Sequence, residues 1–216
     1  MSEVPRIAVV NYGAGNLRSV AKALARSGLL PDVTSDPARV READGVVLPG
    51  VGAFADAMAG LRQRGLDAAL RAVWEKGTPY LGLCLGLQLL FEWSDEHGRS
   101  AGFGVFRGGV ERFSERDPRG EKLRVPHIGW NKVEYTGRHP LLAALPPADC
   151  YYFVHAYRAL PCDNSLVVGS AEYGGAFAAA VAGERIFAVQ FHPEKSQAAG
   201  KQLLDAFAQW VQVCRN

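Results

Sequence analysis

The sequence is poor in cysteine, has almost no net charge and contains no long hydrophobic run. Its 24 lysines and arginines balance 22 aspartates and glutamates to a formal charge of +2, and no basic cluster occurs. Neither nucleic acid nor a membrane surface is therefore indicated as a partner. The apolar run at residues 7–10 is too short for the core of a signal peptide or for a membrane span. We expect a cytoplasmic protein.

The four cysteines, at positions 84, 150, 162 and 214, form no CxxC pair and no metal-like spacing with histidine. A disulfide between Cys150 and Cys162 is compatible with the sequence, but reduced thiols are the expectation for a chain without an export signal. We expect no metal and no cofactor. The 216 residues, 48% apolar and 21% charged, have the composition of an ordinary globular domain.

Strand-like and helix-like segments alternate through the first half of the chain. Short strands are predicted at residues 6–11, 31–35, 44–48 and 78–83, the first of them an apolar, β-branched run. Helical patterns follow at residues 16–27, in the segment that ends at residue 74, and from about residue 85. Strands that alternate with helices predict a parallel sheet with helices on both faces.

Strand-like runs with little helix between them follow from residue 103. They lie at residues 105–113, 123–135, 151–159, 166–173, 177–181 and 186–191. Residues 114–121 predict an exposed turn, and a helix over residues 196–213 closes the chain. The sequence therefore predicts one α/β domain over residues 1–216. Its sheet is expected to be mixed and mainly parallel, with flanking helices and an added antiparallel region.

The segment around Cys84 has the pattern of a nucleophile elbow. Gly82 and Gly86 flank Cys84 at two positions on either side, at the junction of the fourth strand with a helix. Small residues there let the neighbouring backbone pass a strained turn that exposes the nucleophile. Free N–H groups at the start of the helix favour a thiolate. The alternative is a buried structural cysteine among leucines, but the position of Cys84 after a strand and before a helix favours a nucleophile.

A thiolate mechanism requires an imidazole and a carboxylate that orients it. His192 ends the strand at residues 186–191, and Glu194 lies two positions further on, so both side chains project the same way if the segment is extended. The alternative for this His-Pro-Glu segment is a surface turn. The other histidines, expected in loops or as packed core residues, are His97, His127, His139 and His155.

Acyl transfer also requires N–H donors for the developing oxyanion. Leu85, the residue after the nucleophile, is expected to supply one of them. The glycine-rich loop at residues 49–52 is expected to supply the other from Val51, although an ordinary turn is the alternative. As a hypothesis, the Gly50–Val51 peptide takes two orientations, of which only one offers its N–H to the oxyanion.

With these residues assembled, the sequence resembles the class I glutamine amidotransferases. Within that family it is most similar to the glutaminases that serve imidazole glycerol phosphate synthase, and the resemblance extends from end to end. The motifs that carry it are NYGAGNL (11–17), PGVG (49–52), GLCLGLQ (82–88), PHIGWN (126–131), YYFVHAY (151–157) and QFHPEKS (190–196).

Gly13 and Gly15 follow a predicted strand and could also suggest dinucleotide binding, but Arg18 stands where that motif has its third glycine.

The resemblance implies a flavodoxin-like sheet and the hydrolysis of glutamine to glutamate and ammonia. Cys84 would form a γ-glutamyl thioester, and His192 would protonate the leaving ammonia and then activate water. The residues that would hold glutamine are Gly52, Gln88, His155 and Ala156. Many relatives carry Ser or Thr in place of Ala156, so no side-chain role is implied at that position.

The resemblance further implies a heterodimer with a (β/α)8-barrel cyclase, which uses the ammonia to make imidazole glycerol phosphate and an aminoimidazole carboxamide ribotide. The residues expected to face this partner are Asn11, Tyr12, Asn16, Trp130, Tyr152 and Lys195. For Trp130 and Tyr152, core or rim packing is the alternative.

Three other functions are compatible with parts of the sequence. A glutaminase of another synthase, for anthranilate or pyridoxal phosphate, is disfavoured by the motifs at residues 126–131 and 151–157. An α/β cysteine peptidase or a thiol enzyme that modifies small molecules is disfavoured by Gln88 and by the His-x-Glu arrangement. A non-catalytic binding subunit is disfavoured because the cysteine, histidine and glutamate are all present.

Overall fold

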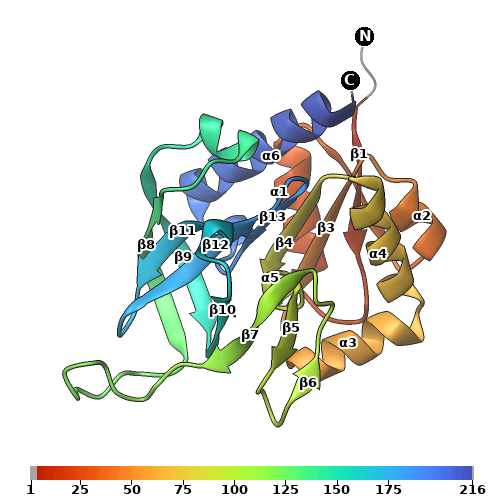
Figure 1. The fold of residues 1–216 in the computed structure, drawn as a ribbon. Coiled ribbons are helices and arrows are strands. Elements are labelled where there is room, and N and C mark those ends of the chain that lie inside the picture. Colours follow the sequence, from red (N-terminus) through yellow and green to blue (C-terminus); the bar gives the residue numbers. More distant parts are fainter. Residues whose placement is uncertain (1–3, 216) are drawn as a thin grey trace.

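The computed structural model describes residues 4–215 and centres on a nine-stranded mixed sheet (Figure 1). The strand order is β2-β1-β3-β4-β13-β12-β11-β8-β9. The parallel half consists of β2 (Leu30–Thr34), β1 (Arg6–Val10), β3 (Gly45–Gly50), β4 (Tyr80–Cys84) and β13 (Ile186–Val189). The antiparallel half consists of β12 (Ala176–Ala182), β11 (Val167–Glu172), β8 (His127–Tyr135) and β9 (Ala148–His155). The predicted mixed sheet with an antiparallel addition is confirmed, and its two halves are of similar extent.

Helices cover both faces of the parallel half, as predicted. On one face lie α1 (Leu17–Arg26) and α6 (Gln197–Arg215), and on the other lie α2 (Pro37–Arg41), α3 (Phe54–Gln63) and α4 (Leu66–Lys76). Alternate residues of β1 enter the two cores: Ile7 and Val9 pack with α1 and α6, whereas Ala8 and Val10 pack with α2 to α4. The apolar run at residues 7–10 of β1 therefore contributes side chains to both cores. Within residues 4–215, no helix has the length and apolar character needed to cross a bilayer.

A second, four-stranded sheet was not foreseen from the sequence. It contains β10 (Tyr157–Pro161), β7 (Phe106–Arg112), β5 (Phe91–Ser94) and β6 (Ser100–Ala101). The single strand expected over residues 151–159 is split at Ala156, because the chain leaves the main sheet after His155 and joins the second sheet at Tyr157. Ala156 therefore lies where the two sheets meet.

Other boundaries also differ from the prediction. The helix expected from Leu85 is the single turn α5 (Leu85–Gln88), and β5 follows it closely. The segment is buried on every side, so no amphipathic pattern marks where the helix ends. The long helix ending at residue 74 is two helices, broken at Gly65, which has φ 64°. Short 3₁₀ turns complete the fold at η1 (Pro140–Ala144), η2 (Asn164–Leu166) and η3 (Pro193–Lys195).

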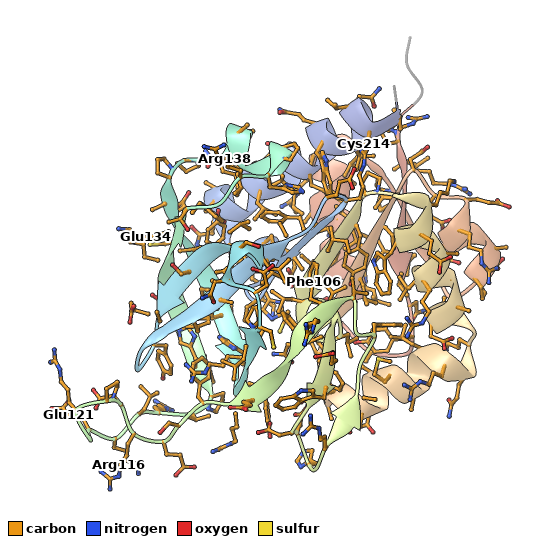
Figure 2. The ribbon with its side chains drawn as sticks, in the orientation of Figure 1. Phe106, Arg116, Glu121, Glu134, Arg138 and Cys214 are labelled. Carbon is orange, nitrogen blue, oxygen red and sulfur yellow. The ribbon has the colours of Figure 1, made fainter. Side chains whose placement is uncertain are left out.

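The expected exposed turn at residues 114–121 is a loop that projects from the body of the molecule, with Arg116 and Glu121 toward its tip (Figure 2).

The carboxyl ends of three adjacent parallel strands, β3, β4 and β13, lie side by side at one edge of the main sheet. Gly50 at the end of β3 is in register with Cys84 at the end of β4, and Leu83 is in register with Val189 at the end of β13. The residues that follow these strands are thereby gathered at one edge of the sheet, where α/β folds place their sites.

Candidate active site

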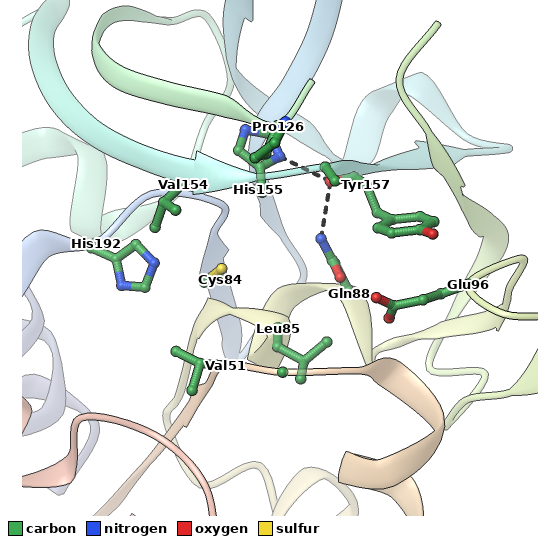
Figure 3. A pocket seen from close by; sticks show the side chains of 12 residues that line it. Val51, Cys84, Leu85, Gln88, Glu96, Pro126, Val154, His155, Tyr157 and His192 are labelled. Carbon is green, nitrogen blue, oxygen red and sulfur yellow. Dashed lines mark hydrogen bonds between the residues drawn. The ribbon is translucent and has the colours of Figure 1, made fainter. Parts of the chain in front are cut away.

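The turn at Cys84 is a strained strand-to-helix junction. Cys84 has φ 53° and ψ −105°, a backbone conformation that costs a non-glycine residue about 1–3 kcal/mol and that persists only where the surroundings impose it. The thiol consequently points away from the end of β4 and lines a cavity (Figure 3). Since α5 is one turn long, its macrodipole is small, and the individual N–H groups and neighbouring side chains carry the electrostatics.

The two glycines of the elbow stand where the backbone passes too closely for a side chain. A Cβ atom on Gly86 would lie 1.9 Å from the carbonyl oxygen of Leu48 on β3. A Cβ atom on Gly82 would lie 2.6 Å from the carbonyl oxygen of Gly86. Both distances are far inside van der Waals contact, so the turn that presents Cys84 can form only with glycine at these two positions.

His192 and Glu194 form a buried pair beside the thiol. Nδ1 of His192 donates to Oε1 of Glu194 over 2.9 Å, and the two side chains are 5% and 3% exposed. Nε2 of His192 is buried and makes no hydrogen bond, and the ring lines the same cavity as Cys84 (Figure 3). Burial lowers the pKa of His192, but the adjacent Cys84 and Glu194 outweigh it and raise the pKa above its ordinary value. The raised pKa favours the imidazolium form of His192 beside Cys84.

His192 and Glu194 do not pair by the strand alternation expected from the sequence. The segment after His192 is not extended, because residues Pro193–Lys195 form the 3₁₀ turn η3. Glu194 therefore reaches the imidazole across a tight turn that begins at the proline, not by strand alternation.

The residues expected to supply the two oxyanion donors lie at the cavity, Val51 directly after β3 and Leu85 at the start of α5. Val51 and Leu85 both line it, and a Cβ atom on Gly50 would lie 2.6 Å from the Leu85 Cβ and 2.8 Å from the Tyr12 hydroxyl. Burial and the nearby Cys84 raise the pKa of Tyr12, and the backbone N–H of Val51 partly offsets them. Tyr12 is only 4% exposed. It therefore lies beneath the glycine loop, and its contact with a partner stays a prediction.

Gln88 uses both of its amide hydrogens within the protein. Its Nε2 donates to the carbonyl oxygen of Tyr157 over 3.0 Å and to Oε1 of Gln190 over 2.9 Å. The remaining polar atom, Oε1, is an acceptor that Gln88 offers to the cavity it lines (Figure 3).

Glu96 is a cavity residue that the sequence did not reveal. Its Oε2 accepts from the backbone N–H of Phe54 over 2.7 Å, and the side chain extends toward Gln88 (Figure 3). Glu96 follows Asp95 in a charged loop, and no local pattern distinguishes one acidic residue from the other. Only the tertiary fold separates them, because Glu96 faces the cavity.

The cavity has a volume of ≈ 330 Å³ and brings together residues from six separate segments of the chain. Its lining residues are Val51, Gly52, Cys84, Leu85, Gln88, Glu96, Pro126, Val154, His155, Ala156, Tyr157 and His192. Every residue expected to serve as nucleophile, base, oxyanion donor or substrate contact is among them, and Glu194 lies behind His192. The volume suits a small molecule such as an amino acid.

Three of the expected partner-facing residues form one patch beside this site. Trp130 is 50% exposed, which excludes core packing, and its ring meets that of Tyr152 edge-on at 6.1 Å. Nζ of Lys195 lies 5.9 Å from the centre of the Tyr152 ring. Asn11 is half-buried and Asn16 exposed, in the loop between β1 and α1. We call Trp130, Tyr152 and Lys195 the aromatic patch.

Sequence comparison identifies relatives along nearly the whole chain. A family model for class I glutamine amidotransferases matches residues 8–210. The imidazole glycerol phosphate synthase subunit HisH of Moorella thermoacetica is 48% identical, over 97% of this chain and 97% of that protein. The subunit of the same name from Methylococcus capsulatus is 49% identical, over 94% of this chain and 96% of that protein.

Solved structures share the fold at lower identity. The crystal structure of a glutamine amidotransferase matches with a TM-score of 0.73 and 19% identity, over 95% of this chain and 98% of that one. PurLQS from Thermotoga maritima matches with a TM-score of 0.72 and 19% identity, over 96% of this chain and 99% of that one. These two likenesses concern the fold alone. By the match over residues 8–210 and the identity to its relatives, the chain belongs to the class I glutamine amidotransferase family.

Proposed function

We propose that this protein hydrolyses glutamine to glutamate and ammonia and delivers the ammonia to a synthase partner. The observation that carries the proposal is that Cys84 and His192 line one small cavity, with Glu194 hydrogen-bonded behind His192. A thiol, an imidazole of raised pKa and a buried carboxylate are the groups that nucleophilic acyl transfer requires. Membership of the family agrees with this chemistry.

In the proposed reaction, the Cys84 thiolate attacks the carboxamide carbon of glutamine. The oxygen of that carboxamide becomes an oxyanion, which the N–H groups of Val51 and Leu85 stabilise. The His192 imidazolium gives its proton to the departing ammonia, leaving a γ-glutamyl thioester on Cys84. The neutral imidazole then takes a proton from water, which attacks the thioester and releases glutamate. Glu194 holds the ring in place and balances its positive charge.

The cavity also offers groups that suit the amino-acid end of glutamine. The carboxylate of Glu96 and the Oε1 atom of Gln88 are acceptors on one wall, and they fit the α-ammonium group. Backbone groups of Gly52 and of His155 and Ala156 fit the rest of the substrate. Ala156 brings no hydroxyl, so at this position only the backbone can bind.

The recognition of the ammonium group is tested with Glu96→Gln. The variant should raise the KM for glutamine about tenfold or more with a smaller change in kcat, because a charged hydrogen bond common to ground and transition states is lost. Asp95→Asn, which removes the neighbouring charge outside the cavity, is the matched control. An unchanged KM in Glu96→Gln would assign the ammonium site to other groups.

The proposal of a partner is supported by the relatives, whose names make them subunits of imidazole glycerol phosphate synthase. We infer a heterodimer with a (β/α)8-barrel cyclase that turns the ammonia into imidazole glycerol phosphate and an aminoimidazole carboxamide ribotide, in the cytoplasm. The aromatic patch, with Asn11 and Asn16, is the proposed contact surface, since exposed aromatic rings beside a cation are typical of binding hot spots.

The partner proposal is tested by mixing the protein with a histidine-pathway cyclase and measuring glutamine-dependent product. We expect product with the wild type, and a fall of about tenfold or more in binding for Trp130→Ala. Val213→Ala, which shortens an exposed apolar side chain on α6, serves as control. No product with any such cyclase would favour a glutaminase of another synthase, while leaving glutamine hydrolysis intact.

A further inference from the structure

Gln190, the residue after β13, touches the nucleophile although the proposed reaction gives it no role. It is 0% exposed and follows the register pair of Val189 with Leu83, which places it opposite Cys84. Its Nε2 lies 3.4 Å from the Cys84 Sγ atom, a hydrogen-bond length for the larger sulfur acceptor. Its Oε1 accepts from Gln88 over 2.9 Å. One buried amide thus connects the nucleophile to a substrate-facing side chain.

The orientation of this amide follows from its neighbours. The carbonyl oxygen of Tyr157 can only accept, so the Gln88 atom 3.0 Å away from it must be the amide nitrogen. That nitrogen has a second hydrogen, which requires an acceptor from Gln190. Gln190 must therefore turn its oxygen toward Gln88 and its N–H toward the sulfur. The group at Cys84 is a donor by necessity.

Two buried histidines extend the same chain of donors and acceptors. His155 Nδ1 donates to the Tyr157 carbonyl over 2.8 Å, and His155 Nε2 accepts from His127 Nδ1 over 3.0 Å. His127 Nε2 faces the side-chain amide of Asn131, which also donates to the Glu172 carbonyl. Burial lowers the pKa of His155 to about 3 and that of His127 to about 4, so both rings are neutral and each donates once and accepts once. The Tyr157 carbonyl is thereby held from two sides.

We propose that Gln190 is a further residue of the active site, which stabilises the Cys84 thiolate through its amide N–H and fixes Gln88 beside it. A donor aimed at a buried anion in a place that excludes water has a large effect on the ionisation of that anion. The Tyr157 carbonyl and the histidine pair keep the amide in its donating orientation. This inference rests on the proposed role of Cys84 as nucleophile, but its test needs neither glutamine nor a partner.

The test measures alkylation of Cys84 by iodoacetamide as a function of pH, read by peptide mass. Gln190→Met keeps the length of the side chain but removes the donor. In this variant, the pH at which alkylation of Cys84 is half-maximal should rise by about one unit relative to the wild type, which corresponds to about tenfold less thiolate at neutral pH. In Gln190→Glu the rise should be at least as large, because an anionic carboxylate replaces the donor. The exposed Cys150 and Cys162 give an internal reference whose profiles must not move.

Thr78→Val is the matched control, since Thr78 is a buried polar residue just before β4, at the opposite end of the strand from Cys84. An unchanged half-maximal pH in the folded Gln190 variants would overturn the proposal. If a variant does not fold, the ¹⁵N resonance of the Gln190 side-chain amide is followed in the wild type as the pH is changed. This resonance should shift with the same pH midpoint as the alkylation of Cys84. A resonance that does not shift when Cys84 ionises would also overturn the proposal.

Discussion

His192 Nδ1 lies 2.9 Å from Glu194 Oε1, and both side chains are almost completely buried. The carboxylate therefore acts on the imidazole without screening by water. Because the adjacent Cys84 and Glu194 raise the pKa of His192 despite its burial, the ring stays protonated above the pH at which an exposed histidine loses its proton.

Glu194→Gln should move the alkaline limb of kcat/KM for glutamine to lower pH. The proton on His192 is needed for the leaving ammonia, and the wild type loses it only as the pH rises through the raised pKa. Removing the carboxylate lowers that pKa, so the loss begins earlier, and kcat falls by about 100-fold or more. Rate profiles of the partner-bound enzyme from pH 6 to pH 10, with the exposed Glu184→Gln as control, measure both effects. A limb that stays in place would show that Glu194 does not support the imidazolium.

Gly86→Ala should lower the free energy of unfolding by about 3 kcal/mol or more, because the new Cβ would lie 1.9 Å from the Leu48 carbonyl oxygen. Gly183→Ala is the matched control, since its new Cβ would lie 3.3 Å from a movable ring atom of Phe106. Urea unfolding of both variants measures the difference. If the two substitutions had similar small effects, the close approach of α5 to β3 would not be a feature of the folded protein.

Stability should fall as the pH is lowered from about 6.5 to about 4. Burial lowers the pKa of His127 and of His139 to about 4 and that of His155 to about 3, so in this window the unfolded chain takes up protons that the folded chain does not. Each histidine then contributes a slope of up to about 1.4 kcal/mol per pH unit. His192 acts in the opposite direction near the top of this window, because its raised pKa keeps it protonated in the folded chain while the unfolded chain loses that proton as the pH rises through about 6.5. At lower pH it is protonated in both states and adds nothing.

Urea unfolding at pH 7, 6 and 5 measures this slope. His139→Gln, a substitution far from the candidate site beside Trp210, should reduce the slope by the share of one histidine. A slope that is the same in the variant and the wild type would mean that His139 is accessible to protons in the folded state.

The parts of the fold that were predicted from sequence are those set by local patterns. Apolar runs identified β1, β3 and β4, and the spacing of Gly82 and Gly86 identified the turn at Cys84, because this spacing is contained in one short segment of the sequence. The second sheet was missed because β5 follows a single helical turn within a uniformly buried segment. The break at Ala156 likewise has no local signal, since residues on both sides of it are strand-like.

The residues of the candidate site likewise differ in how far a local sequence pattern identifies them. Cys84 could be assigned from its own segment, whereas His192 depended on resemblance to a family, and the contact with Glu194 is made by a 3₁₀ turn instead of an extended strand. Glu96 and Gln190 were not singled out, because their importance arises from what lies opposite them. Gln190 faces Cys84 across the sheet, 106 positions away in sequence.

The most direct test of the central claim is glutamate release from glutamine by the complex with cyclase, comparing the wild type with Cys84→Ala. The account predicts steady turnover for the wild type and none above background for Cys84→Ala, with cyclase binding retained because the substitution removes one buried sulfur atom. Glutamate release by Cys84→Ala at a rate near that of the wild type would contradict the assignment of Cys84 as the nucleophile.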